Sequence, residues 1–162
     1  MDTKLLVDYI LQIIPEFEYQ FGRPMKLVTK SELTNYQSKV LSVLQFVPEM
    51  TMSELADRLV MSKSQLTANV DVLVRLNLVE RRTDPGDRRK IIVRMTEEGK
   101  TYMVRTKEAM CRYYDLYYDR MTEDEKLKLR HSMSQLLALL EKLNKFSHEI
   151  SQEQIQQVRK QR

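Results

Sequence analysis

The sequence is poor in several residue types on which other classes of protein depend. Of 162 residues, one is cysteine, three are glycine, four are proline, two are histidine and none is tryptophan. A single cysteine excludes a disulfide framework within the chain and most multi-thiolate metal sites. Few glycines and prolines argue against a turn-rich all-β fold. The first residues include Asp2 and no small-residue cleavage site, so we expect no signal peptide, no membrane span and a cytoplasmic protein.

The charge that is present is concentrated in one place. The formal net charge is only +4, but residues 75–94 carry seven basic and three acidic side chains, which accounts for all of that excess. A focused basic block favours a polyanionic partner more than a diffuse charge of the same size does. Its basic members are Arg75, Arg81, Arg82, Arg88, Arg89, Lys90 and Arg94.

Four segments carry the capping-box pattern, a Ser or Thr followed three residues later by Glu or Gln. In this motif each side chain satisfies a backbone N–H that the start of a helix leaves without a partner. Each pair precedes apolar residues at helical spacing, so the four pairs predict four helix starts. The pairs are Thr34 and Gln37, Thr51 and Glu54, Ser62 and Gln65, and Thr122 and Glu125.

Two longer helices complete the helical expectation. Apolar residues recur at helical spacing over residues 3–21, with a kink or break expected just before Pro15 and an end at Gly22 and Pro24. A second long helix is expected over residues 97–120 and is followed by the one capped at Thr122, which reaches about residue 146.

Between the helix starts at Thr51 and Ser62 there is room only for a short helix and a tight turn. Two helices joined in this way cross steeply, as in a helix-turn-helix. The periodicity then changes, and residues 78–82 and 90–95 predict two strands joined by a turn over 83–87. A helix-turn-helix followed by a basic hairpin is a winged helix-turn-helix.

We therefore predict a mainly α fold of the α+β winged helix-turn-helix type, with about six helices, a short β-hairpin wing and a helical dimerisation region from both chain ends. The flanking helices contain more apolar surface than a small winged helix covers, so they pack within the chain, pair with a second copy, or both. The expected regions are an N-terminal dimerisation helix and connection (1–33), the winged DNA-binding region (34–96), C-terminal dimerisation helices (97–146) and a polar basic tail (147–162).

The second helix of the helix-turn-helix has a small, polar face. With Leu66, Val70 and Leu73 directed to the core, its opposite face suits entry into a major groove. Gln65 has the amide group that reads adenine bidentately, and Lys63 lies where it reaches the DNA backbone. The predicted DNA contacts on this helix are Lys63, Ser64, Gln65, Thr67 and Ala68.

The hairpin tip carries further basic residues. An arginine at a wing tip enters a minor groove, where the negative potential is strongest when the groove is narrow. Arg81 and Arg82 on the preceding strand are placed to meet phosphates. The predicted DNA contacts of the wing are Arg82, Arg88, Arg89 and Lys90.

Both features also have a plainer interpretation, which the sequence leaves open. Charged hairpins commonly protect a sheet edge in water, and the side chains near a helix start are often only solvated. Asp71 and Arg75, four residues apart, fit an ordinary surface pair.

Several short motifs follow one another in this region. They are Met52-Ser53-Glu54-Leu55-Ala56, Ser62-Lys63-Ser64, Leu78-Val79-Glu80-Arg81, and Asp87-Arg88-Arg89 followed by Met95-Thr96-Glu97-Glu98-Gly99. With these motifs, residues 34–99 resemble the MarR family of bacterial transcriptional regulators.

The resemblance implies a homodimer in which helices from both chain ends form the interface and two winged regions address the half-sites of a pseudo-palindrome. It implies that Arg89 reaches a minor groove and that Asp87 holds the wing in shape. It also implies repression of transcription, with release from DNA by a small, often aromatic or phenolic, ligand.

The chain departs from the family pattern at three positions. Ala68 stands where many members have arginine, which leaves base reading to its polar neighbours. Asn77 replaces the common glycine at the end of the helix, and asparagine tolerates the left-handed conformation expected there. Met95 replaces the usual leucine before the threonine of the wing signature.

Eight tyrosines and four phenylalanines supply the residues for a small-molecule site. The same aromatic residues fit packing in a core or a dimer interface, and both interpretations stay open. The lone Cys111 is expected to pack as a small apolar group rather than to sense oxidants. The tentative ligand-pocket residues are Phe17, Tyr36, Phe46 and Tyr113.

No Gly-rich phosphate loop, Ser/His/Asp arrangement or metal-ligand cluster is present, so we expect no enzyme, cofactor or metal. The predicted function is that of a sequence-specific transcriptional regulator that binds double-stranded DNA as a homodimer. The alternative is a protein-interaction module or antirepressor that keeps the fold without binding DNA.

Overall fold

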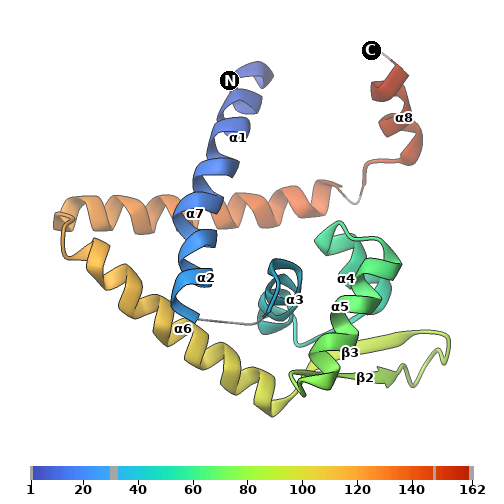
Figure 1. Ribbon diagram of the computed structural model, residues 1–162. Helices are drawn as coiled ribbons and strands as arrows, with labels where there is room; N and C mark the ends of the chain where they lie inside the picture. The colour runs from blue at the N-terminus through green and yellow to red at the C-terminus, as the bar shows by residue number, and fades with distance from the viewer. Residues whose placement is uncertain (1, 30–32, 148, 161–162) are drawn as a thin grey trace. The chain divides into compact units, whose positions relative to one another are not determined.

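The computed structural model describes residues 2–29, 33–147 and 149–160 (Figure 1). The chain is mainly helical with a small antiparallel sheet, which confirms the predicted fold class. It divides into two compact units, Met1–Tyr114 and Asp115–Arg162. His148, Gln161 and Arg162 of the predicted tail lie outside the described residues.

The first unit contains the winged region. Its elements are α1 (Thr3–Phe17), the π-helix η1 (Glu18–Gly22), α2 (Arg23–Thr29), α3 (Asn35–Phe46), β1 (Glu49–Thr51), α4 (Met52–Leu59), α5 (Lys63–Arg75), β2 (Val79–Thr83), β3 (Ile91–Met95) and most of α6 (Glu97–Tyr118). The second unit contains the end of α6, α7 (Glu123–Ser147) and α8 (Gln152–Lys160).

The four predicted capping boxes are all present, which confirms the helix starts. A fifth, which the sequence reading missed, begins α8. There the N–H of Ser151 donates to Gln154 Oε1 at 2.8 Å, and the N–H of Gln154 donates to Ser151 Oγ at 3.2 Å. The predicted tail therefore contains a helix of its own.

Of the kink or break expected before Pro15, the break is not formed, and the predicted end of the helix at Gly22 and Pro24 is wrong. Pro15 lies inside α1 rather than after a break. The chain also stays helical past Gly22 and Pro24, because the π-helix η1 connects α1 to α2. A π-turn changes the hydrogen-bond spacing, here just before Pro24, which has no N–H to donate. Pro24 therefore follows a turn whose hydrogen bonds are already displaced from the α-helical pattern.

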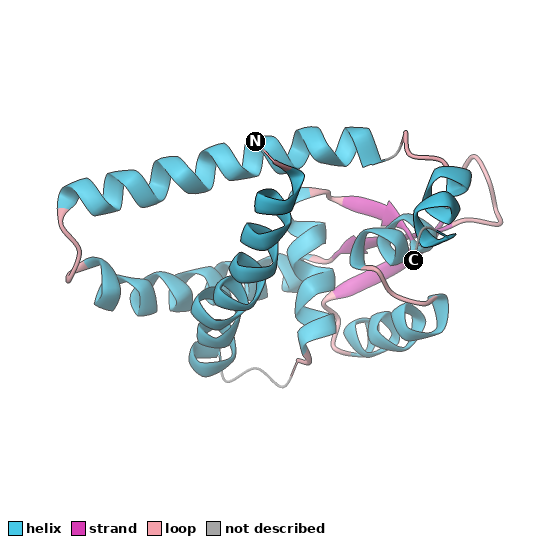
Figure 2. Ribbon diagram, turned by 90° about the horizontal axis from the view of Figure 1, so that it is seen from above, coloured by secondary structure: helices cyan, strands magenta, loops and turns pink. Residues whose placement is uncertain are grey.

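The sheet has the strand order β1-β3-β2, with β3 in the centre. Figure 2 shows its strands in magenta. The hairpin of β2 and β3 lies within one residue of its predicted position, with Val79 opposite Met95 and Thr83 opposite Ile91. The three-residue strand β1 was not predicted, because Glu49–Thr51 is too short to show an alternating pattern.

The buried hydrophobic core of the described residues lies between Val40 and Met95. The predicted inward face of α5 is confirmed, and apolar side chains of α3, α4 and α5 share one core with Val79 and Val93 of the sheet. Phe46 does not join them, since it is 83% exposed at the last turn of α3. The core residues are Val40, Leu41, Leu44, Leu55, Ala56, Met61, Leu66, Val70, Leu73, Leu78, Val79, Val93 and Met95.

Two turns of this unit have a non-glycine residue in the left-handed region. Asn77 ends α5 with φ 56°, as the sequence predicted for an asparagine at this position. Val60 ends α4 with φ 53° and is 93% exposed. A β-branched residue is strained in this conformation, so the turn of the helix-turn-helix carries local strain.

The start of α6 is fixed to the end of α5 through Thr96 and Gly99. Thr96 Oγ1 donates to the carbonyl of Asn77 at 2.6 Å and accepts the N–H of Gly99 at 3.0 Å. The N–H of Thr96 donates to the carbonyl of Leu78 at 3.1 Å. A Cβ on Gly99 would lie 2.1 Å from that carbonyl oxygen, so only glycine allows this approach.

Helices from both chain ends expose apolar side chains. No residue of α1 is buried, although leucines and isoleucines repeat along it. On α7, leucines between Leu127 and Leu143 are exposed in the second unit. None of the described helices has the length and apolar content needed to cross a membrane.

Replacement of Val60 by glycine should raise the free energy of unfolding by about 1 kcal/mol, because it removes left-handed strain from an exposed residue. Chemical denaturation measures this change. A lower stability than that of the parent would contradict the strain.

Replacement of Gly99 by alanine should lower the free energy of unfolding by roughly 3 kcal/mol, because the new Cβ collides with backbone that cannot withdraw. The matched control is Gly22→Ala, whose Cβ meets only a side-chain carbon at 3.4 Å. That variant should keep the parent stability or gain slightly. Equal effects at the two positions would contradict the close approach.

Candidate nucleic-acid interface

The outward face of α5 carries the side chains predicted to contact DNA. The helix is anchored below by Leu66, Val70 and Leu73, all fully buried. The outward side of its N-terminal half is therefore small and polar, and it is held in place by the core. A helix face of this kind can enter a major groove. The five predicted residues on this helix, all exposed, are Lys63, Ser64, Gln65, Thr67 and Ala68.

Gln65 also closes the capping box of the same helix. Its Oε1 accepts the N–H of Ser62 at 3.1 Å and the Ser62 hydroxyl at 3.0 Å. Its amide nitrogen has no hydrogen-bond partner within the described residues. Bidentate reading of adenine uses both the oxygen and the nitrogen of the amide. Such reading by Gln65 would therefore require this cap to open.

The loop between β2 and β3 projects beyond the strands (Figure 1) and is built on Asp84. The Oδ1 of Asp84 accepts the N–H of Gly86 at 2.7 Å and that of Asp87 at 3.1 Å, which forms an Asx turn. The N–H of Asp84 donates to the carbonyl of Lys90 at 3.0 Å. These bonds give the wing tip a defined backbone.

Asp87 holds Arg89, which lies in the loop just before β3. Its Oδ1 accepts both the backbone N–H and the Nε of Arg89 at 3.1 Å. The guanidinium and then the backbone N–H of Arg89 lower the pKa of Asp87. The Arg89 side chain is nevertheless 91% exposed. Arg88 and Lys90 are also exposed, and neither forms a salt bridge with another described residue.

Strand alternation sends the two arginines of β2 to opposite faces. Arg81 shares a face with the buried Val79, whereas Arg82 shares the other with Glu80. Arg82 Nε lies 3.1 Å from Glu80 Oε1, and Glu80 also pairs with Arg94, its partner on β3. The hydrogen bond from Arg94 is the main cause of the lowered pKa of Glu80.

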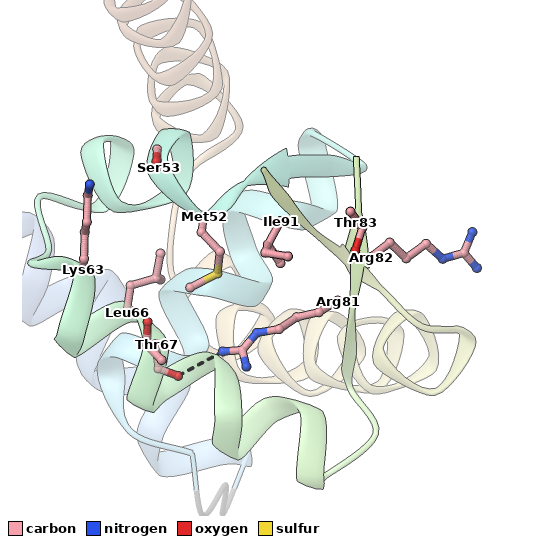
Figure 3. A pocket seen from close by; sticks show the side chains of 9 residues that line it. All are labelled: Met52, Ser53, Lys63, Leu66, Thr67, Arg81, Arg82, Thr83 and Ile91. Atoms are coloured by element: carbon pink, nitrogen blue, oxygen red, sulfur yellow. Dashed lines mark hydrogen bonds between the residues drawn. The ribbon is translucent and has the colours of Figure 1, made fainter. Parts of the chain in front are cut away.

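Arg81 extends to α5 instead. Its Nη1 lies 2.5 Å from Asp71 Oδ1, and its Nη2 donates to the carbonyl of Thr67 at 3.2 Å (Figure 3). The surface pair of Asp71 with Arg75 that the sequence suggested is not formed, because β2 brings the Arg81 guanidinium to the same carboxylate.

A groove of about 560 Å³ lies between α4, the first half of α5 and the hairpin (Figure 3). Lys63 and Arg82, two of the predicted DNA contacts, lie at this groove on opposite sides. Its lining residues are Met52, Ser53, Lys63, Leu66, Thr67, Arg81, Arg82, Thr83 and Ile91.

Two of the four tentative ligand-pocket residues meet in one aromatic cluster. The rings of Phe17 and Phe21 lie 4.7 Å apart, Phe21 lies 5.8 Å from Tyr114, and Tyr114 lies 5.6 Å from Tyr113. The cluster joins the helices at the N-terminus to α6. The other two candidates belong to α3 and are Tyr36 and Phe46.

Sequence reasoning did not single out Asp84 or Asn69, and it paired Asp71 with Arg75 rather than with Arg81. Asn69 Nδ2 donates to the Gln65 carbonyl at 2.8 Å and so braces the same helical turn. The Asp-Pro-Gly-Asp turn signal was sufficient to identify Asp84. No local signal identifies the partner of Asp71, which lies on a strand packed against the helix.

The chain is similar to several known proteins. A model described as the MarR family matches residues 31–90. The HTH-type transcriptional repressor MdtR of Bacillus subtilis is 28% identical over 137 residues, which cover 82% of this chain and 86% of MdtR.

Two solved structures share the fold. The transcriptional regulator PA4135 has a TM-score of 0.64 at 30% identity, covering 86% of this chain and 96% of its own. A cysteine-to-serine mutant of Escherichia coli MarR was solved with operator DNA. Its structure has a TM-score of 0.59 at 23% identity, and the match covers 85% of this chain and 99% of the MarR chain.

The pairing of Asp87 with Arg89 is testable by NMR titration of the carboxyl group. Because the folded-state pKa is lowered, the interaction supports the ordered wing at neutral pH and is lost as pH falls through that lowered value. Arg89→Ala should raise the pKa of Asp87 part of the way back, since a backbone N–H remains. An unchanged pKa in this variant would contradict the pairing.

Proposed function

We propose, on the premise that this chain belongs to the MarR family, that it is a DNA-binding transcriptional regulator that represses transcription from a pseudo-palindromic operator. In this proposal the first half of α5 enters a major groove and the wing tip an adjacent minor groove. The observation that carries the proposal is that one compact unit presents an exposed polar helix face beside an exposed basic hairpin with an ordered tip.

The order of the wing tip favours DNA binding over a merely solvated hairpin. Exposed basic residues need no fixed backbone to keep a sheet edge in water. Here the side chains of Asp84 and Asp87 fix the tip through hydrogen bonds to the backbone, and the Arg89 guanidinium pairs with Asp87 while its side chain stays 91% exposed. A preorganised cation loses less conformational entropy when it binds a narrow groove.

The proposed roles on α5 differ between residues. Lys63, Ser64 and Thr67 are assigned to the DNA backbone or base edges, and the Ala68 methyl to an apolar base contact. Gln65 keeps its cap in the free protein, so we assign its Nε2 to a base acceptor while Oε1 stays with Ser62. The wing contacts in the proposal are Arg82, Arg88, Arg89 and Lys90.

The proposal includes a homodimer. Large apolar side chains repeat along α1 and α7 and are exposed, and closed two-fold pairing is the usual way to cover such surfaces. Regions 1–33 and 97–146 then supply the dimer contacts, region 34–96 reads DNA, and region 147–162 stays peripheral. Such a protein acts in the cytoplasm, where bacterial DNA lies.

We also propose that a small aromatic effector releases the protein from DNA. The cluster of Phe17, Phe21, Tyr113 and Tyr114 places rings and phenolic hydroxyls between the N-terminal helices and α6. An apolar ligand with one hydroxyl or carboxylate fits such surroundings. Tyr36 and Phe46 lie on α3 of the same unit and are the other two residues proposed for this site.

The first test is the salt dependence of binding to duplex DNA. Arg88→Ala combined with Arg89→Ala should weaken binding to all sequences, and it should reduce the slope of log affinity against log salt by about one unit for each lost phosphate contact. Fluorescence anisotropy over a range of salt concentrations measures both effects.

The matched control removes two positive charges elsewhere in the first unit, through Lys39→Ala with Arg105→Ala. Both residues are exposed and lie outside the interface. If the wing contacts DNA, this control should change the affinity and the salt slope less than the wing variant does. The same binding as the parent in the wing variant at every salt concentration would refute the wing's role and support the interaction-module alternative.

Gln65 is tested by base preference. Gln65→Met should change the relative affinities for duplexes that differ at one base pair, by about 1 kcal/mol at that position. Ser62→Ala is the matched control, because it breaks the same cap and keeps the amide. The control should lower affinity evenly, and an even loss in Gln65→Met would show that Gln65 serves only the cap.

A further inference from the structure

The two neighbouring arginines of β2 carry the same charge but lie in different surroundings. Arg82 points away from α5, whereas Arg81 points toward it and spans the groove between strand and helix (Figure 3). Residues next to each other on a strand face opposite sides, so this difference follows from the strand itself. Comparing variants of Arg81 and Arg82 therefore separates the effect of position from the effect of charge.

The guanidinium of Arg81 binds two groups of α5 one helical turn apart. One is the carboxylate of Asp71 at 2.5 Å, and the other is the backbone carbonyl of Thr67 at 3.2 Å. A planar guanidinium offers several N–H donors in a fixed fork, so it holds two acceptors in one geometry as a lysine does not. The contact thus fixes a direction as well as a distance.

We infer that Arg81 is a positioning residue that holds the wing at a fixed place relative to the recognition helix α5, and that it acts on DNA through the wing rather than by contacting a phosphate. This inference rests on the proposed function and deepens it. Asp71 is part of the same contact, although its negative charge opposes DNA binding.

The position of Arg81 on β2 explains how the contact reaches the wing tip. Only Arg82 and Thr83 separate it from Asp84, whose side chain and backbone order the loop. A helix in a major groove and a wing in the neighbouring minor groove must keep a set spacing to meet one DNA molecule. The contact of Arg81 with α5 holds the hairpin at a set distance from the helix.

The same geometry makes a phosphate contact by Arg81 unfavourable. Its charge is matched by a carboxylate 2.5 Å away, and its Nη1 and Nη2 both already have acceptors on α5. A phosphate would have to replace Asp71. Arg82 and Arg89 also pair with carboxylates, at 3.1 Å, but their side chains are 55% and 91% exposed, whereas that of Arg81 is 32% exposed. Arg88 and Lys90 form no salt bridge with described residues.

The experiment compares Asp71→Asn with Arg81→Met in DNA titrations with the full-length protein. If Arg81 positions the wing, each variant weakens binding about fivefold, and the double variant is no weaker than either alone. If Arg81 binds phosphate, Asp71→Asn strengthens binding, because it removes a negative charge and frees the arginine. Equal or tighter binding by Asp71→Asn overturns the inference.

Two further variants separate positioning from direct contact. In the background of Arg88→Ala with Arg89→Ala, Arg81→Met should have no further effect, whereas Arg82→Met should still reduce the salt slope. Arg81→Lys, which keeps the charge and loses the fork, should resemble Arg81→Met. A full fivefold loss for Arg81→Met in the wing-deficient background overturns the inference.

A readout without DNA keeps this test separate from that of the proposed function. The amide of Asp84 donates to the Lys90 carbonyl and that of Lys90 to the Asp87 carbonyl, so their hydrogen exchange reports on the order of the wing. Asp71→Asn and Arg81→Met should speed this exchange several-fold, and Arg82→Met should not. If the parent protein binds no duplex DNA, the proposed function fails. In that case, unchanged hydrogen exchange in Asp71→Asn and Arg81→Met would by itself overturn the positioning role.

Discussion

The close contact of Gly99 with the carbonyl of Leu78 is the constraint on which the arrangement of the first unit depends. It brings the start of α6 against the turn where α5 passes into β2, and Thr96 completes the junction with hydrogen bonds to both Asn77 and Leu78. The end of α5, the start of β2 and the start of α6 thus meet at this turn, although α6 lies further along the sequence. The end of the recognition helix, the hairpin and the long helix α6 therefore start from a common point.

From that junction the winged unit is built as one body. Side chains from α3, α4 and α5 and from the sheet form a continuous apolar core, and Arg81 adds a polar tie between α5 and β2 on the exposed side. The polar helix face and the basic wing tip are positioned by this body. The apolar side chains of α1 and α7 lie outside the core and are available for a second copy of the chain.

The parts that sequence predicted well depend on local interactions. The capping boxes, the inward face of α5 and the left-handed Asn77 each follow from a few neighbouring residues. The strand β1 and the passage through Pro24 were missed because pairing with β3 and a π-turn decide them. Both are properties of the folded chain rather than of a short window.

The same distinction holds for the candidate site. The exposure of the nominated residues on α5 and the wing follows from helical and strand periodicity, so it was predictable. The conflict between the cap and the proposed base contact of Gln65 was implicit in its motif, because one oxygen cannot cap the helix and read a base at the same time. The link from Asp71 to Arg81 requires the packing of β2 on α5, which no local pattern contains.

The central claim is that two copies of this winged unit read DNA together. Selection of bound sequences from a random pool of duplex DNA tests it most directly. The account predicts enrichment of a two-fold symmetric site with half-sites about one helical turn apart. A pool that shows no enrichment after repeated rounds, with folded protein at each step, would contradict the claim.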